Sequence, residues 1–293
     1  MCRLYGFRAN EDTRVECSLV HAENALLMQS RSDMIGRAHP DGWGIAFYQD
    51  THPNVERRST AAFDDLHFSS TAGRINSQTV VAHVRLASVG GLSDVNSHPF
   101  TNGQWTFAHN GTVRGFEILR DELIAETLPS LNSFRQGFTD SEHCFYWLLS
   151  RLARAGIDLT TPVQDTNTFA RVISEAVAQL DQRCRDIEPD ETPCLNFLIT
   201  EGQVLAVTRW NNSLYWVARE GVHDCEVCGI PHVQQTEGTN YRAAIVASEP
   251  VSREAWQEVP NHHLLLVDAD IRVGIHAIEQ CVSECPGARS ILL

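Results

Sequence analysis

The sequence predicts a mixed α/β protein in which β-sheets carry helices on their outer faces. Strand-like and helix-like segments alternate in blocks, with strands first, then helices, then strands again, and such blocks pack as sheets covered by helices. The 293 residues are 43 % hydrophobic and 20 % charged. The chain can therefore bury a sizeable core, in one large domain or two small ones, and disorder is not expected.

The N-terminal block begins with a strand over residues 2–9. Apolar residues at helical spacing predict a helix over residues 18–29, with Ser18 as its N-cap. A glycine-containing turn then leads into a strand over 45–48. Residues 79–87 are almost continuously apolar, which predicts a strand that is buried on both faces.

The middle and end of the chain continue this pattern. Residues 105–111 predict a short strand that runs into a turn. Two amphipathic helices follow, one over 141–155 with Asp140 or Ser141 at its N-cap and one over 167–184. The strands expected in the second half cover residues 195–200, 204–210, 213–218, 243–248 and 263–268.

Composition excludes several classes of partner. The chain has 23 basic and 37 acidic residues, a net charge of −14, so it does not attract nucleic acid or anionic membranes. No apolar run approaches the roughly 18 residues of a membrane span. The first ten residues lack the pattern of a signal peptide. With nine cysteines, an odd number, reduced thiols and a cytoplasmic location are expected.

Cys2 is the first residue with catalytic potential. Methionine aminopeptidases remove Met1 when the next side chain is small, which would give Cys2 a free α-amine. That amine has a pKa of about 7.7–8.0, so much of it is an unprotonated base near neutral pH. One residue would then supply both a thiol nucleophile and its base. The alternative is an ordinary buried cysteine in a strand.

Further motifs follow Cys2 in order: HPDGWGIAFY, AHVRLASVG, SHPF, AHNG and TDSE, with ASEP at 247–250. Together with MCRLYGF they resemble the class II glutamine amidotransferases, which are N-terminal-nucleophile hydrolases. The resemblance extends to a stand-alone branch that includes γ-glutamyl hydrolases. It implies a four-layer αββα sandwich of two mainly antiparallel sheets. Residues 2–293 would form one domain, with the catalytic motifs in residues 2–142.

The resemblance assigns residues to the parts of a glutamine-like substrate. Arg85 would grip the α-carboxylate, since a guanidinium can form two parallel hydrogen bonds to it; the alternative is a structural ion pair. Asp140 would bind the α-ammonium, although its position also suits an N-cap. Glu142 is the second candidate for that role.

The Asn110-Gly111 pair would form the oxyanion hole, with the Asn110 side-chain amide and the Gly111 backbone N–H as donors. Glycine allows close approach and a positive φ angle, but the same dipeptide is common in hairpin turns. His98 and His109 match family positions that line or support the substrate site. We expect structural roles for both histidines, because the terminal amine already serves as the base.

Asp41, Trp43 and Gly44 are expected to build the wall near the nucleophile. In relatives, backbone groups after the arginine position the substrate, which here points to Ser88 and Val89.

Possible metal ligands occur late in the chain: Cys225, Cys228, His223, His232, Cys281 and Cys285. A structural zinc site usually has two separated ligand pairs. Cys225-x-x-Cys228 is the only CxxC motif, since Cys281 and Cys285 are four residues apart. The prediction is therefore no metal, with these thiols as unrelated core or surface residues.

The expected reaction is hydrolysis of a γ-glutamyl amide through a thioester on Cys2, without metal or organic cofactor. The substrate is a small γ-glutamyl compound, and the products are glutamate and ammonia or an amine. One alternative is a glutaminase subunit that delivers ammonia to a separate synthase partner, since no nucleotide-binding motif is present. A partner peptidase subunit is a further alternative. Another is an inactive glutamine or γ-glutamyl sensor.

Overall fold

In a computed structural model of the chain, residues 2–233 and 240–279 are described. One antiparallel sheet contains seven strands: β1 (Arg3–Arg14), β2 (Trp43–Gln49), β3 (His52–Arg58), β4 (Asn76–Val84), β9 (Tyr215–Glu220), β10 (Arg242–Ala247) and β11 (Gln257–Glu258). A second contains six: β5 (Phe100–Asn102), β6 (Trp105–Thr112), β7 (Cys194–Thr200), β8 (Leu205–Arg209), β12 (His263–Val267) and β13 (Val273–Ala277). Their spatial orders are β11-β9-β10-β1-β4-β2-β3 and β13-β12-β8-β7-β6-β5.

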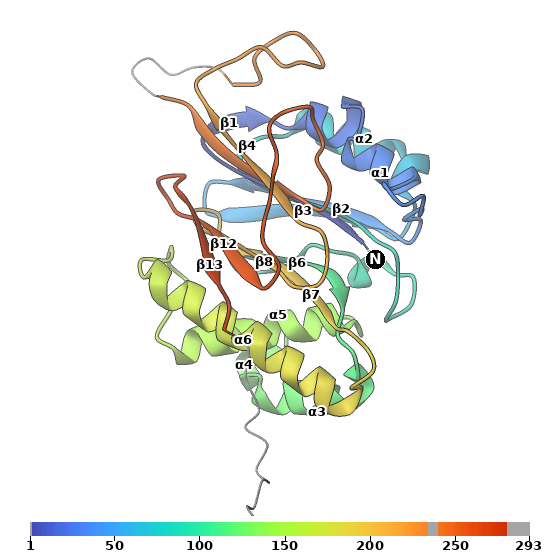
Figure 1. Cartoon of the computed structure of the whole chain (residues 1–293), viewed down its shortest axis with the longest axis vertical. Coiled ribbons are helices and arrows are strands. Elements are labelled where there is room, and N and C mark those ends of the chain that lie inside the picture. Colours follow the sequence, from blue (N-terminus) through green and yellow to red (C-terminus); the bar gives the residue numbers. More distant parts are fainter. Residues whose placement is uncertain (1, 234–239, 280–293) are drawn as a thin grey trace, which may run out of the picture.

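Helices cover the outer face of each sheet. The helical elements are η1 (Cys17–His21), α1 (Leu26–Arg31), η2 (Ala62–Asp64), α2 (Leu66–Arg74), η3 (Asp94–Asn96), α3 (Phe116–Glu126), α4 (Pro129–Asn132), α5 (Asp140–Arg154) and α6 (Thr166–Ile187). Figure 1 shows α1 and α2 against the seven-stranded sheet, and α3, α5 and α6 against the six-stranded sheet. The expected four-layer αββα arrangement is confirmed.

Three apolar clusters fill the spaces between the four layers. Phe68 packs with the outer face of the seven-stranded sheet, and Phe145 and Phe169 pack with the outer face of the other sheet. The third cluster includes Leu4 and Leu198, which belong to different sheets. Apolar burial on both faces of each sheet explains why the central strands are almost continuously hydrophobic.

The expected single helix over 18–29 is wrong. The chain forms the five-residue π-helical turn η1, becomes extended at Ala22, and starts again as α1 at Leu26. The Asn24 side chain donates to the carbonyl of Pro250 at 2.7 Å, which anchors the break to a distant segment. Ser18 does not cap a helix here, because it lies inside η1.

Two further details of the sequence prediction need correction. The strand expected to turn at Asn110-Gly111 continues through this pair to Thr112 as β6. The N-cap of α5 is Thr139, whose Oγ1 accepts from the Glu142 N–H at 3.2 Å. Asp140 is instead the first residue of the helix, so its carboxylate is available for other contacts.

The motifs that the sequence analysis singled out meet at one end of the stacked sheets. β1 pairs with β4, with Arg3 opposite Val84, which places Cys2 beside the residues that follow β4. β6, from the other sheet, contacts both β1 and β4. No helix in the described parts of the chain is both long enough and apolar enough to cross a membrane.

Candidate active site

Cys2 lies just before β1, with its side chain buried. The backbone N–H of Leu86 donates to Cys2 Sγ at 3.4 Å. Burial raises the pKa of the Cys2 thiol, although this N–H and the charge of Arg85 act in the opposite direction. The thiol is therefore protonated at neutral pH and needs a base before it can act as a nucleophile.

A small pocket opens beside Cys2. Its lining contains these residues that the sequence assigns to catalysis or substrate binding: Cys2, Arg85, His98, His109, Gly111 and Asp140. Ser88 and Val89 also line the pocket. Asn110 precedes Gly111 on β6 but is not part of the lining. Residues that are far apart in the sequence thus share one pocket with the thiol.

Arg85 is a buried cation without a carboxylate partner among the described residues. Its Nη2 donates to the carbonyls of Val89 at 2.9 Å and Gly90 at 3.2 Å, and its Nη1 donates to that of Gly91 at 3.3 Å. Burial lowers the pKa of Arg85, partly offset by the nearby thiol and carboxylates. The ion pair considered as an alternative is therefore not formed. A buried guanidinium held only by neutral carbonyls favours an anionic ligand.

Asp140 and Glu142, the two candidates for the ammonium site, form different contacts. Asp140 lines the pocket, where Oδ2 accepts from the Val113 N–H at 2.9 Å and Oδ1 accepts from the Ser141 N–H at 2.8 Å. The Glu142 carboxylate accepts instead from the backbone N–H groups of Gln136 and Gly137 at 2.9 and 2.6 Å. Glu142 therefore fixes the loop before α5, and Asp140 is the acidic residue in the pocket.

Gly111 permits a close approach between two strands. A Cβ atom at this position would lie 1.8 Å from the carbonyl oxygen of Cys194, on the paired strand β7. Gly111 does not have a positive φ angle. Of the two reasons expected for a glycine here, the close approach therefore applies and the positive φ angle is wrong. Asn110 is buried, and its Nδ2 donates to Ser248 Oγ at 3.0 Å. The amide has a second N–H for another acceptor.

His109 is fixed by hydrogen bonds through both ring nitrogens. Nε2 lies 2.8 Å from the carbonyl of Cys194, and Nδ1 lies 2.9 Å from Ser141 Oγ. A carbonyl can only accept, so Nε2 carries the proton. Burial lowers the pKa of His109, which keeps the ring neutral. Both ring nitrogens are thus occupied, which favours a structural support over a general base.

His98 lies in the pocket lining with both ring nitrogens free of hydrogen bonds to the described residues. Its ring packs against His83 and Phe100, with centroid separations of 4.3 and 4.7 Å. Burial lowers the pKa of His98 well below its usual value. His98 is therefore a neutral ring with free polar atoms at the pocket.

The segment over residues 39–44 (HPDGWG) holds residues that line the pocket. Asp41 Oδ2 accepts from the Ala87 N–H at 2.8 Å and so holds the backbone beside Cys2. A Cβ atom at Gly44 would lie 2.1 Å from the carbonyl oxygen of His98, which explains why only glycine fits there. Trp43 is buried in the outer core against Phe68 and does not face the pocket.

Residues 1–284 match the family described as glutamine amidotransferases class-II. The chain belongs to this family. It is 29 % identical to the Saccharomyces cerevisiae protein named "Probable glutamine amidotransferase DUG3", over 91 % of this chain and 82 % of the relative. It is 26 % identical to the gamma-glutamyl-hercynylcysteine sulfoxide hydrolase of Mycobacterium tuberculosis, over 91 % and 93 % of the two chains.

A solved structure of a class-II glutamine aminotransferase domain protein from Silicibacter pomeroyi has the same fold. The TM-score is 0.60 at 20 % identity, and the match covers 95 % of this chain and 100 % of the other. Membership of the class-II amidotransferases makes the chain an amidohydrolase-type enzyme.

Sequence reasoning missed a buried ionic network behind Cys2 of this class-II amidotransferase. Arg3 Nε donates to Glu249 at 2.8 Å, its Nη2 donates to Asp33 at 2.5 Å, and its Nη1 donates to the Cys2 carbonyl at 2.9 Å. His39 Nε2 lies 3.2 Å from the same Asp33 oxygen. Burial acts to raise the pKa of Asp33, but the Arg37 N–H and the charge of Arg3 outweigh it and lower the pKa.

The ASEP segment supplies two of the residues that hold this site. Glu249 binds Arg3, and Ser248 Oγ accepts from both the Leu4 N–H and Asn110 Nδ2 at 3.0 Å. The motif itself is visible in the sequence. Its contact with the first strand is not, because it depends on the pairing of β1 with β10.

Proposed function

We propose that this chain hydrolyses the γ-glutamyl amide bond of a small molecule through a thioester on Cys2. The observation that carries the proposal is the shared pocket of Cys2, Arg85, Gly111 and Asp140. A γ-glutamyl compound offers an α-carboxylate for a cation, an α-ammonium for an anion and a γ-carbonyl for a nucleophile. The mycobacterial relative, named as a hydrolase of a γ-glutamyl compound, supports this substrate class.

The proposed mechanism begins with removal of Met1, which lies outside the described residues. The α-amine of Cys2, with a pKa of about 7.7–8.0, accepts the thiol proton as Sγ bonds to the γ-carbon. The negative charge on the former carbonyl oxygen is stabilised by the Gly111 N–H and the free N–H of the Asn110 amide. The C–N bond then breaks, and the ammonium proton moves to the leaving nitrogen.

Water completes the cycle. The same α-amine takes a proton from a water molecule, whose oxygen attacks the thioester carbon. The C–S bond breaks, glutamate leaves, and the thiolate recovers the proton. No redox step or cofactor is involved.

Substrate binding is expected to rearrange the loop after β4. The Arg85 N–H groups that now donate to the carbonyls of residues 89–91 would donate to the α-carboxylate instead. Asp140 would bind the ammonium with an oxygen that already accepts one backbone N–H.

A second candidate is a glutaminase that passes ammonia to a separate synthase subunit. The name of the yeast relative as an amidotransferase favours it. Both candidates share the Cys2 chemistry and differ in the leaving group and in the need for a partner.

The test is a substrate panel for the purified chain: glutamine, glutathione and other γ-glutamyl amines, with glutamate detected by mass spectrometry. We expect release of glutamate without a partner and an intact mass that lacks Met1. Cys2→Ala should reduce release to background. Cys184→Ala, which removes another buried thiol from α6, should keep activity. Full activity in Cys2→Ala would refute the mechanism, and activity only with a second subunit would favour the ammonia-delivering role.

A further inference from the structure

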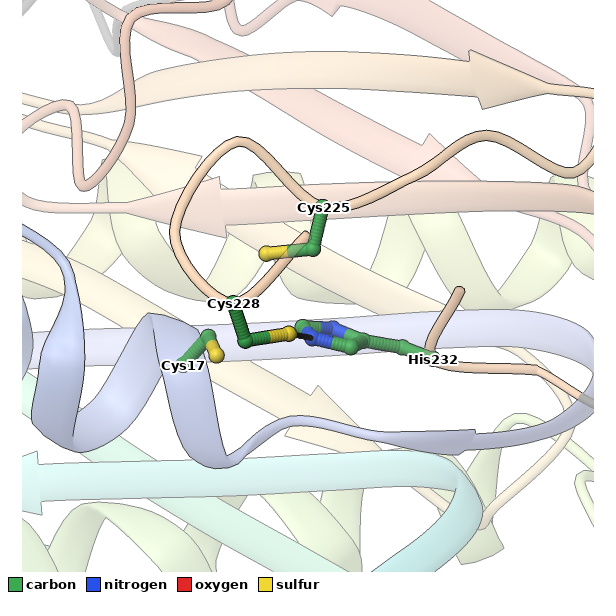
Figure 2. A group of neighbouring side chains, drawn as sticks. All are labelled: Cys17, Cys225, Cys228 and His232. Carbon is green, nitrogen blue, oxygen red and sulfur yellow. Dashed lines mark hydrogen bonds between the residues drawn. The ribbon is translucent and has the colours of Figure 1, made fainter. Parts of the chain in front are cut away.

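Four side chains with metal-binding atoms gather on the outer side of the seven-stranded sheet. They are Cys17 of η1 and Cys225, Cys228 and His232 of the segment that follows β9 (Figure 2). Their three sulfur atoms and one ring nitrogen all lie within 4.8 Å of one another. The sequence prediction treated these thiols as unrelated because a second ligand pair is missing. The structure supplies the missing ligands from a distant turn and from His232.

We propose that Cys17, Cys225, Cys228 and His232 bind one structural zinc ion. Three thiolates and one imidazole form a standard structural zinc set, and soft sulfur ligands select zinc over hard cations such as Mg²⁺ or Ca²⁺. All four positions are filled by protein atoms, whereas a catalytic zinc keeps one position open. The ion would therefore act on the fold and not on the γ-glutamyl bond.

The distances require only small adjustments. With Zn–S of about 2.3 Å and Zn–N of about 2.0–2.1 Å, tetrahedral ligand atoms lie about 3.4–3.8 Å apart. Cys228 Sγ is already 3.2 Å from His232 Nε2. Separations of up to 4.8 Å must close by about 1 Å when the ion binds. The cluster also borders a cavity of about 470 Å³ lined by Cys17, Cys225 and His232, which gives an ion access to it.

The backbone around the cysteines already has the shape of a ligand loop. The Gly229 N–H donates to the carbonyl of Cys225 at 2.8 Å, and Gly229 has a φ of +74°, so the chain turns tightly after Cys228. The Val227 N–H points at Cys225 Sγ at 3.4 Å. A backbone N–H directed at a sulfur ligand fixes the orientation of that ligand.

His232 and Cys17 are brought together by contacts at the end of β1. The Arg14 N–H donates to the carbonyl of His232 at 3.0 Å, and Thr13 forms a β-bridge with Val233. Cys17 follows three residues after Arg14, at the start of η1. Cys17 and His232, which are far apart in the sequence, are thus brought together by main-chain hydrogen bonds that do not depend on the metal.

A stabilising ion also explains how the segment over 221–233 keeps its shape. It has no regular helix or strand, and its residues Glu226, Val227, Cys228 and Ile230 are exposed. Such a segment has little apolar surface to bury, so folding cannot offset its loss of conformational entropy by packing alone. A metal bound by four side chains can supply that free energy.

The test is the metal content of the full-length protein, measured by elemental mass spectrometry after purification under reducing conditions. We expect about one zinc per chain, and almost none in Cys225→Ala or Cys17→Ala. Cys184→Ala, a buried thiol outside the cluster, is the matched control and should keep its zinc. Protein that contains no zinc and takes up none from added zinc chloride would overturn the proposal, as would zinc that persists in both cluster variants.

A second measurement separates metal binding from folding defects. Cobalt(II) added to chelator-treated wild-type protein should give the intense absorption of tetrahedral cobalt thiolate, and His232→Ala should weaken it. Removal of zinc should increase hydrogen exchange at the Cys225 and Gly229 amides, which donate to the carbonyls of Ile230 and Cys225 within the ligand loop. A colourless cobalt complex, or unchanged exchange after metal removal, would overturn the structural role. Glutamate release measured in parallel tests Cys2 chemistry independently.

Discussion

Acid should destabilise this protein because several histidines are buried in the neutral form. His83 has no exposed surface, and its Nε2 donates to the carbonyl of His109 at 3.1 Å. Burial lowers the pKa of His83 to about 3 and that of His39 to about 4. An unfolded histidine titrates at about 6.5. Between pH 6.5 and these lower values the unfolded chain binds more protons than the folded one, so stability present above pH 6.5 is lost as the pH falls.

The size of the effect follows from the two pKa values. pH 5 is about 1.5 units below the pKa of a histidine in the unfolded chain, and each unit corresponds to about 1.36 kcal/mol. His83 alone should therefore cost about 2 kcal/mol of unfolding free energy between pH 7 and pH 5. Burial raises the pKa of Glu142 and Glu201, which acts in the opposite direction over the same range. The contribution of His83 to the pH dependence of the unfolding free energy must therefore be measured by comparing variants.

His83→Gln is the variant of choice, because the Gln amide keeps a donor near the position of Nε2 and cannot be protonated. Urea unfolding at pH 7, 6 and 5, followed by tryptophan fluorescence, gives the free energy by linear extrapolation. The loss between pH 7 and pH 5 should be smaller in His83→Gln than in wild type by about 2 kcal/mol. His52→Gln, at an exposed position, should lose as much as wild type. An equal loss in His83→Gln and wild type would refute the reasoning.

Three further changes test the pocket. Arg85→Lys should raise KM about 10- to 100-fold, since one charged hydrogen bond of roughly 1.5–3 kcal/mol is lost; an unchanged KM in steady-state kinetics would remove Arg85 from the substrate site. Gly111→Ala should lower kcat about 10²- to 10³-fold, because the new Cβ would collide with the carbonyl of Cys194 and displace the oxyanion donor. Near-normal turnover would exclude that donor. Ser248→Ala leaves the Asn110 amide without its acceptor, so kcat should fall with KM unchanged; a change in KM alone would contradict a positioning role.

Long, strongly periodic segments were predictable from the sequence. The strand β4 and the helices α5 and α6 were expected within about three residues of their bounds, whereas β1 continues past the expected end at residue 9 to Arg14. Short elements with few apolar residues were missed, and so was the 11-residue helix α3. The edge strand β3 contains a proline and a single aliphatic residue, and α2 buries only Phe68, Thr71 and Ala72. These elements are stabilised by packing against their neighbours, and the local spacing of apolar residues does not indicate such packing.

Several residues of the pocket were also predictable from the sequence. Arg85, Asp140 and Gly111 follow from the chemistry of a γ-glutamyl substrate together with the family motifs. What the motifs could not indicate is how each side chain is held. Thr139 caps α5 in place of Asp140, and Ser248 fixes the Asn110 amide.

By itself the sequence determined the fold class, the positions of the main strands and helices, and the chemical groups available for catalysis. These follow from local spacing and from side-chain chemistry, which need no knowledge of distant contacts. Only the tertiary structure decided that Glu249 and Asp33 hold Arg3 beside Cys2, and that Cys17 meets the thiols of residues 225–228. Such contacts join segments far apart in the chain, and they exist only once the strand pairing around β1 has brought those segments together.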